Sequence, residues 1–140
     1  AAPACMGQYD HLHLTVVQKP EILAQINAAF QKAVGDPNMQ VTYDAPTVIY
    51  VSCKNEDEEI VKGCNAGVVM ENMLLEAADL GLGAVYLFGV SQVLFANEEI
   101  TKLLQIPEGF RTVSAIAVGT SADALQERTL GTDKISTTTL

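Results

Sequence analysis

The chain has 140 residues, of which 49% are apolar and 18% are charged, and its formal net charge is −9. This balance excludes an intrinsically disordered chain, which needs low hydrophobicity and high charge, and it predicts a single domain over residues 1–140. The eight Lys and Arg residues are scattered, so the chain lacks the basic patch that nonspecific nucleic-acid binding requires.

Two further composition features bear on location. No apolar run approaches the roughly 20 residues that cross a bilayer, and the first residues lack the basic start and apolar core of a signal peptide. Cys5, Cys53 and Cys64 are odd in number and lack metal-ligand spacing, which predicts reduced, buried thiols in a cytoplasmic protein. Because the chain starts at Ala1 without an initiator methionine, we expect a fragment, a processed form or a sequence without its leading residues.

The first half of the chain predicts a strand, a helix and a second strand. Residues 12–17 are rich in strand-forming side chains. Pro20 suits the first turn of a helix whose apolar residues recur every three or four positions until Gly35. Residues 36–45 read as a loop, and residues 47–53 are apolar enough for a central strand.

Residues 55–80 predict a long helix that stops at Gly81. Its acidic start, residues 55–59, lies at the positive end of the helix dipole and does not have the spacing of a calcium loop. The helix is apolar on nearly every side, so it must be enclosed almost all round. One domain of this size can hardly supply that enclosure, which predicts a homodimer.

The remaining segments predict a strand at residues 83–88, a short helix at 97–104, a turn at 106–109, a strand at 112–118 and an extended tail at 120–140. Asn97 is the expected N-cap of the short helix. Helices and strands mix without a strict alternation, which indicates an α+β fold or a three-layer α/β/α sandwich.

Acid–base, nucleophilic and metal chemistry find little support, and no catalytic residue or metal ligand is predicted. There is no Gly-x-Ser-x-Gly elbow. His11 and His13 would face the same side of a strand, which permits a metal pair, but no further ligands complete a site and a solvated strand face is the alternative. Gly81-Leu82-Gly83 follows a helix and precedes a strand, the reverse of a phosphate-binding fingerprint, so it reads as a helix stop.

An ordered set of motifs over roughly residues 10–130 resembles the nitroreductase family of flavin enzymes. The motifs, in chain order, are Ala45-Pro46, Asn65, Gly67, Glu71-Asn72-Met73, Leu75-Glu76-Ala77-Ala78, Gly81-Leu82-Gly83 before Tyr86, Gln105-Ile106-Pro107-Glu108-Gly109, and Ala115-Ile116-Ala117-Val118-Gly119. The resemblance implies a three-layer α/β/α sandwich with a mainly antiparallel sheet, in an intertwined homodimer with FMN at the interface. It also implies that NAD(P)H delivers hydride to FMN, which passes it to a nitro, quinone or similar small-molecule acceptor.

The same resemblance implies where the cofactor binds. Leu87, Phe88 and Gly89 would lie against the flavin ring, with a backbone N–H near N5. Arg128, nine residues past Gly119, would match the family's late basic residue at the flavin phosphate, although it could equally be a solvated tail residue.

The start of the chain departs from the family pattern. The basic, serine-containing stretch with which family members usually open is absent before Ala1. Gln8 can replace a donor Asn, and Asp10 stands where a flavin-contacting Gln is expected. These departures keep two alternatives open: a non-catalytic relative that binds a flavin or another small ligand as a dimeric scaffold, and an unrelated α/β binding domain.

Overall fold

The computed structural model describes residues 7–89, 93, 97–124, 127, 129, 131 and 133–140. Its elements, in chain order, are η2 (Tyr9–His11), β1 (Leu12–Val17), α1 (Pro20–Val34), β2 (Thr47–Lys54), α2 (Glu59–Asp79), β3 (Gly83–Tyr86), α4 (Glu98–Leu103) and β4 (Phe110–Gly119). The four strands form one sheet in the order β1-β2-β4-β3, and every neighbouring pair is antiparallel. The register shifts once, between Val51 and Ser52.

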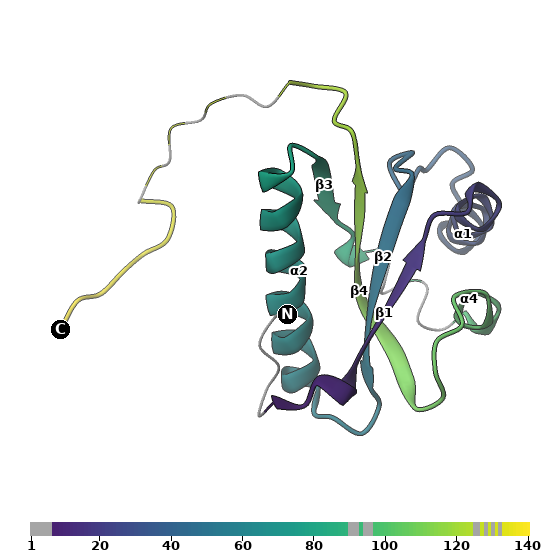
Figure 1. The fold of residues 1–140 in the computed structure, drawn as a ribbon, viewed down its shortest axis with the longest axis horizontal. Coiled ribbons are helices and arrows are strands. Elements are labelled where there is room, and N and C mark those ends of the chain that lie inside the picture. The colour runs from purple at the N-terminus through teal and green to yellow at the C-terminus, as the bar shows by residue number, and fades with distance from the viewer. Residues whose placement is uncertain are drawn as a thin grey trace.

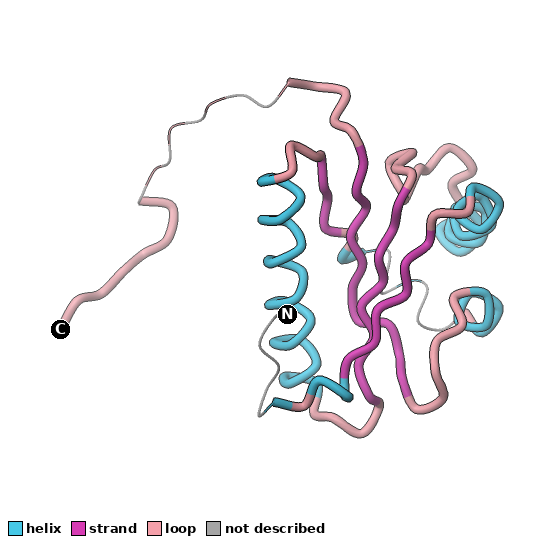
Figure 2. Tube along the Cα trace, viewed as in Figure 1, coloured by secondary structure: helices cyan, strands magenta, loops and turns pink. Residues whose placement is uncertain are grey.

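The sheet is the middle of three layers, as Figures 1 and 2 show. Helix α2 covers one face, and α1 with α4 covers the other. Successive strand residues point to opposite faces, so Tyr50 packs toward α1 and α4 while Val51 packs toward α2. The predicted α+β sandwich with an antiparallel sheet is therefore confirmed.

Three helix ends behave as predicted. Helix α1 carries Pro20 at its start and ends at Gly35, whose φ of 74° is left-handed and whose N–H donates to the carbonyl of Gln31 at 2.9 Å. The side chain of Asn97 accepts from the N–H of Ile100 at 3.2 Å and so caps α4.

Helix α2 starts four residues later than predicted, at Glu59. Residues 54–57 form a turn instead, in which the Asp57 N–H donates to the carbonyl of Lys54 at 3.4 Å. The N–H of Asn55 donates a hydrogen bond to the carbonyl of Gly109 at 2.7 Å. Acidic residues suit both a turn and a first helical turn, and here the contact to Gly109 decides between them.

The other boundary errors lie at β3 and β4. Strand β3 ends at Tyr86 rather than residue 88, since Phe88 and Gly89 already have helical backbone. Strand β4 begins at Phe110 because Phe110 pairs with Lys54 of β2.

The enclosure predicted for α2 is incomplete within one chain. Ala66 and Met70 are buried against the sheet. On the outward side, however, Val68 is 38% exposed and Leu75 is 61% exposed. Of the described helices, none is long and apolar enough to span a membrane.

Residues 42–45 form a tight turn with an unusual backbone. Tyr43 and Asp44 have φ of 53° and 55°, and the N–H of Ala45 donates to the carbonyl of Thr42 at 2.9 Å, as in a type I′ turn. Such turns favour Asn and Gly, and a left-handed residue with a Cβ costs about 1–2 kcal/mol. Asn27 of α1 anchors the turn by hydrogen bonds to Val41 and Thr42.

Gly119 closes β4 against the Pro46 ring. An ideal Cβ at Gly119 would lie 2.8 Å from Cδ of Pro46, which is closer than real Cβ contacts allow. Gly119→Ala should therefore lower the free energy of unfolding by about 1–3 kcal/mol, measured by urea denaturation. Adding Pro46→Ala to that variant removes the ring and should recover most of the loss; a G119A protein of normal stability would contradict the contact.

Candidate functional site

The predicted cofactor-contacting residues lie at two opposite edges of the sheet. Gln8 and Asp10 precede β1 and are called the η2 set, and Leu87 to Gly89 follow β3 and are called the β3 set. Because β2 and β4 lie between these edge strands, three strand spacings of about 4.8 Å separate them by about 14 Å. One chain therefore does not bring the two sets together. Arg128 lies outside the described residues.

The set after β3 combines a buried anchor with exposed aromatic surface. Leu87 is buried, and its N–H donates to the carbonyl of Ala115 at 2.7 Å. Phe88 is 57% exposed and its ring centroid lies 6.1 Å from that of Tyr86, which is 41% exposed. A Cβ built at Gly89 meets no atom within 4 Å, so the backbone there is open to a ligand. An aromatic surface beside accessible backbone suits a flat, polar-edged ring.

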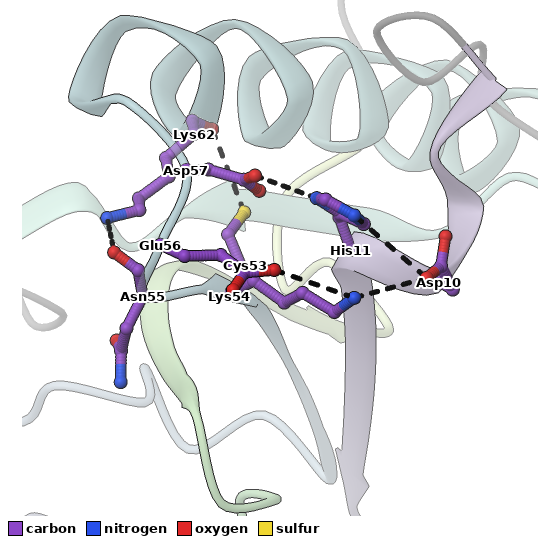
Figure 3. A network of polar contacts seen from close by, with 8 residues as sticks. All are labelled: Asp10, His11, Cys53, Lys54, Asn55, Glu56, Asp57 and Lys62. Carbon is purple, nitrogen blue, oxygen red and sulfur yellow. Dashed lines mark hydrogen bonds and ion pairs between the residues drawn. The ribbon is translucent and has the colours of Figure 1, made fainter.

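The set before β1 is held in a polar network, drawn in Figure 3. The Lys54 ammonium donates to the Asp10 carboxylate at 3.1 Å. This hydrogen bond lowers the pKa of Asp10 below its usual value. The negative charge predicted at this position is therefore paired with a lysine of β2.

The hydrogen bond between His11 and Asp57 ties η2 to the turn before α2. The two side chains meet at 2.7 Å, from His11 Nδ1 to Asp57 Oδ1, and only 15% and 9% of them are exposed. His11 thus lies in a 3₁₀ turn and not on the strand with His13, so the expectation that both histidines lie on one strand face is wrong. Among the described residues, no group of three or more His, Cys, Asp or Glu could hold a metal ion.

A second branch of the network holds the same turn from the side of α2. Lys62, with 4% of its side chain exposed, donates to the Asn55 carbonyl at 2.9 Å and to Glu59 at 3.0 Å. Glu59 also accepts from Arg111 at the start of β4. The turn is thus fixed on both sides by charged hydrogen bonds, which are about twice as strong as neutral ones.

The prediction of buried thiols holds for one of the two described cysteines, and Cys5 lies outside the described residues. Cys53 is buried, and burial, followed by the nearby Asp57 carboxylate, raises the pKa of its thiol to about 11. Such a thiol stays protonated and unreactive at neutral pH. Cys64 on α2 is exposed, so its predicted burial is wrong for the single chain.

A hollow of about 650 Å³ lies beside the η2 set, between α2 and the β1–β2 side of the sheet. Its lining is mainly apolar, with the polar groups of Tyr9, Asn72 and Glu76, and its other residues are Leu12, Leu14, Ile49, Val69, Met73, Ala77 and Val118. This size and mixture are typical of small-molecule sites. No local sequence pattern indicates this hollow, because its walls come from elements that are distant along the chain.

The family relationship is decided by a match along most of the chain. The model of the Nitroreductase family matches residues 8–120. The chain belongs to the nitroreductase family.

The curated and solved relatives agree with this assignment. A Methanothermobacter thermautotrophicus protein, provisionally named NADH dehydrogenase/NAD(P)H nitroreductase, is 34% identical over 115 residues. That alignment covers 79% of this chain and 56% of the relative, so this nitroreductase-family chain spans little more than half the length of the relative.

Solved nitroreductases share the fold. The FMN-bound nitroreductase of Bacteroides fragilis superposes with a TM-score of 0.79 at 23% identity, over 98% of this chain and 80% of the other. The FMN-bound nitroreductase of Desulfitobacterium hafniense gives a TM-score of 0.81 at 19% identity, with the same coverage. At these identities the likeness establishes the nitroreductase fold.

Proposed function

We propose that two copies of this chain bind FMN between them and act as an oxidoreductase. Hydride passes from NAD(P)H through FMN to a nitro, quinone or similar small-molecule acceptor. Family membership supports this proposal, together with the FMN bound to two structural relatives. The observation that carries it is the open aromatic surface of Tyr86 and Phe88 beside the unobstructed backbone of Gly89.

The residues after β3 fit an isoalloxazine ring. Phe88 and Tyr86 offer apolar surface to its flat face, and a Cβ built at Gly89 would meet no atom within 4 Å. Buried Leu87 fixes this segment to β4 and keeps water from beneath it. When bound, FMN supplies the hydride chemistry, and the protein orients the ring and its reaction partners.

The residues before β1 fit the polar parts of the cofactor. Gln8 offers an amide that donates and accepts hydrogen bonds. The ammonium of Lys54 is already held by the Asp10 carboxylate. Arg128 is the proposed partner of the phosphate, since the basic residues described around the η2 set are already paired.

A second copy is part of the proposal for two reasons. The η2 set and the β3 set occupy opposite edges of one sheet, and we propose that the two sets around one flavin come from different chains. The outward side of α2 leaves Val68 and Leu75 exposed, and a partner chain would cover them. NAD(P)H as donor, the acceptor class and a cytoplasmic location are part of this proposal as well.

The network of Figure 3 favours one alternative, a non-catalytic relative that binds a small ligand as a dimeric scaffold. In this alternative, the pairing of Asp10 with Lys54 serves to hold η2 in place and leaves no charge for the flavin.

Steady-state turnover separates the two functions. With FMN present, we expect NADH oxidation that depends on an added quinone or nitro compound and exceeds the rate of free FMN at the same concentration. Phe88→Ala should raise the FMN dissociation constant about tenfold through lost aromatic contact. Val34→Ala, at a similarly exposed apolar residue on the far face, is the control. Rates equal to free FMN would favour the scaffold.

A further inference from the structure

A second, smaller hollow lies at the end of the sheet where β2 begins, β4 ends and β3 starts. Its volume is about 370 Å³. Its lining includes the Tyr43–Asp44 turn, the start of β3 at Gly83 and the residues after β4, Thr120 and Ser121. The site described above uses none of these residues.

The hollow combines one aromatic ring, one carboxylate and two hydroxyls over a floor of small residues. Tyr43 is 65% exposed, so most of its ring is free to contact a ligand. Asp44 is also exposed. In the floor, Gly119 packs closely on Pro46 and Gly83 packs closely on Ser121. A Cβ at Gly119 would clash with Pro46, and one at Gly83 would lie 3.1 Å from Ser121.

The backbone of the turn is strained at these two residues. Tyr43 and Asp44 both have left-handed φ, which Asn and Gly adopt far more readily. Strained residues of this kind gather at ligand-binding positions, where the surrounding structure holds them. Asn27 supplies that support through its bonds to Thr42 and Val41.

We propose that this hollow binds the adenosine end of NADH, an inference that rests on the function proposed above. Adenine stacks on the Tyr43 ring, as bases do on aromatic side chains. The Asp44 carboxylate accepts hydrogen bonds from the ribose hydroxyls, the contact by which an acidic residue selects NAD. The same carboxylate repels a 2′-phosphate, so the site selects NADH over NADPH.

The distance to the proposed flavin-contacting residues suits a dinucleotide. Val85 lines the hollow and Gly89 lies four residues further along the chain. At about 3.3 Å per extended residue the separation is at most about 13 Å. An extended dinucleotide that leaves the hollow at Val85 would therefore bring its nicotinamide to the flavin held against Phe88 and Gly89.

The test is a titration of the full chain, without FMN, with adenosine 5′-monophosphate, followed by backbone amide NMR. Shift changes should concentrate at Tyr43, Asp44, Gly83 and Ser121. Asp44→Asn should weaken binding about tenfold, the size expected for one charged hydrogen bond. Asp79→Asn, an exposed acid at the end of α2, should bind as the wild type does. Adenosine 2′-monophosphate should bind at least tenfold more weakly.

Absence of binding, shift changes at another place, or equal binding by Asp44→Asn would overturn the proposal. A folded state of the variants is verified by circular dichroism, since residue 44 lies in a surface turn. Binding here without any NADH oxidation would leave the nucleotide site standing and refute the proposed function. Turnover that is equally efficient with NADH and NADPH, with no binding of the monophosphate, would refute the nucleotide site alone.

Discussion

Val68→Asp should convert the protein into single chains with a much lower free energy of unfolding. Val68 lies on the outward side of α2, where 38% of its surface is exposed in one chain. If a second copy covers this side, the variant buries an unpaired charge, which costs several kcal/mol. Light scattering should report the mass of one chain, and urea denaturation should show the loss of stability.

Val34→Asp is the matched control for this substitution. Val34 is 40% exposed and lies at the end of α1, on the opposite face of the sheet. We expect it to leave the particle mass unchanged and to alter stability by less than about 1 kcal/mol. Equal behaviour of the two variants would show that the outward side of α2 is a solvent-exposed surface.

Asp57→Ala should lower both stability and FMN affinity, because it removes the partner of a buried histidine. The His11–Asp57 hydrogen bond is 2.7 Å long, and its loss leaves a nearly buried ring nitrogen unsatisfied. We expect a loss of about 1–3 kcal/mol in the free energy of unfolding. We also expect weaker FMN binding, because η2 and the neighbouring Gln8 lose their connection to the turn before α2.

The adjacent residue provides the control for Asp57. Glu56 has 73% of its side chain exposed and lies 3.9 Å from Lys54, so Glu56→Ala should change stability by less than about 0.5 kcal/mol. Urea denaturation and fluorescence titration with FMN measure both quantities. An Asp57→Ala protein as stable as Glu56→Ala would show that the buried contact does not hold η2.

The elements that local chemistry determines were predictable. Pro20 and Gly35 mark the two ends of α1, and Asn97 caps α4, because proline, left-handed glycine and a capping side chain act within a few residues. The layer order was predictable from the apolar faces of the strands and from the family motifs. Helix α2 was found with its correct end but a start four residues too early, since its acids suit a turn as well.

The features that depend on distant residues were not predictable. The His11–Asp57 contact joins residues 46 positions apart, and the sequence around either residue does not indicate it. The left-handed Tyr43–Asp44 turn also escaped prediction, because its residues are not those that such turns favour. Leu87 and Phe88 were predicted inside the third strand but follow it. The roles of Leu87, Phe88, Gly89 and Arg128 stay predictions.

Sedimentation velocity, recorded at the visible absorbance of flavin with FMN added, tests the central claim most directly. The account predicts that the flavin colour travels with a particle of two chains, since its contacts come from opposite edges of two sheets. Colour that travels with a single chain, or that remains with the free cofactor while the protein sediments, would contradict it.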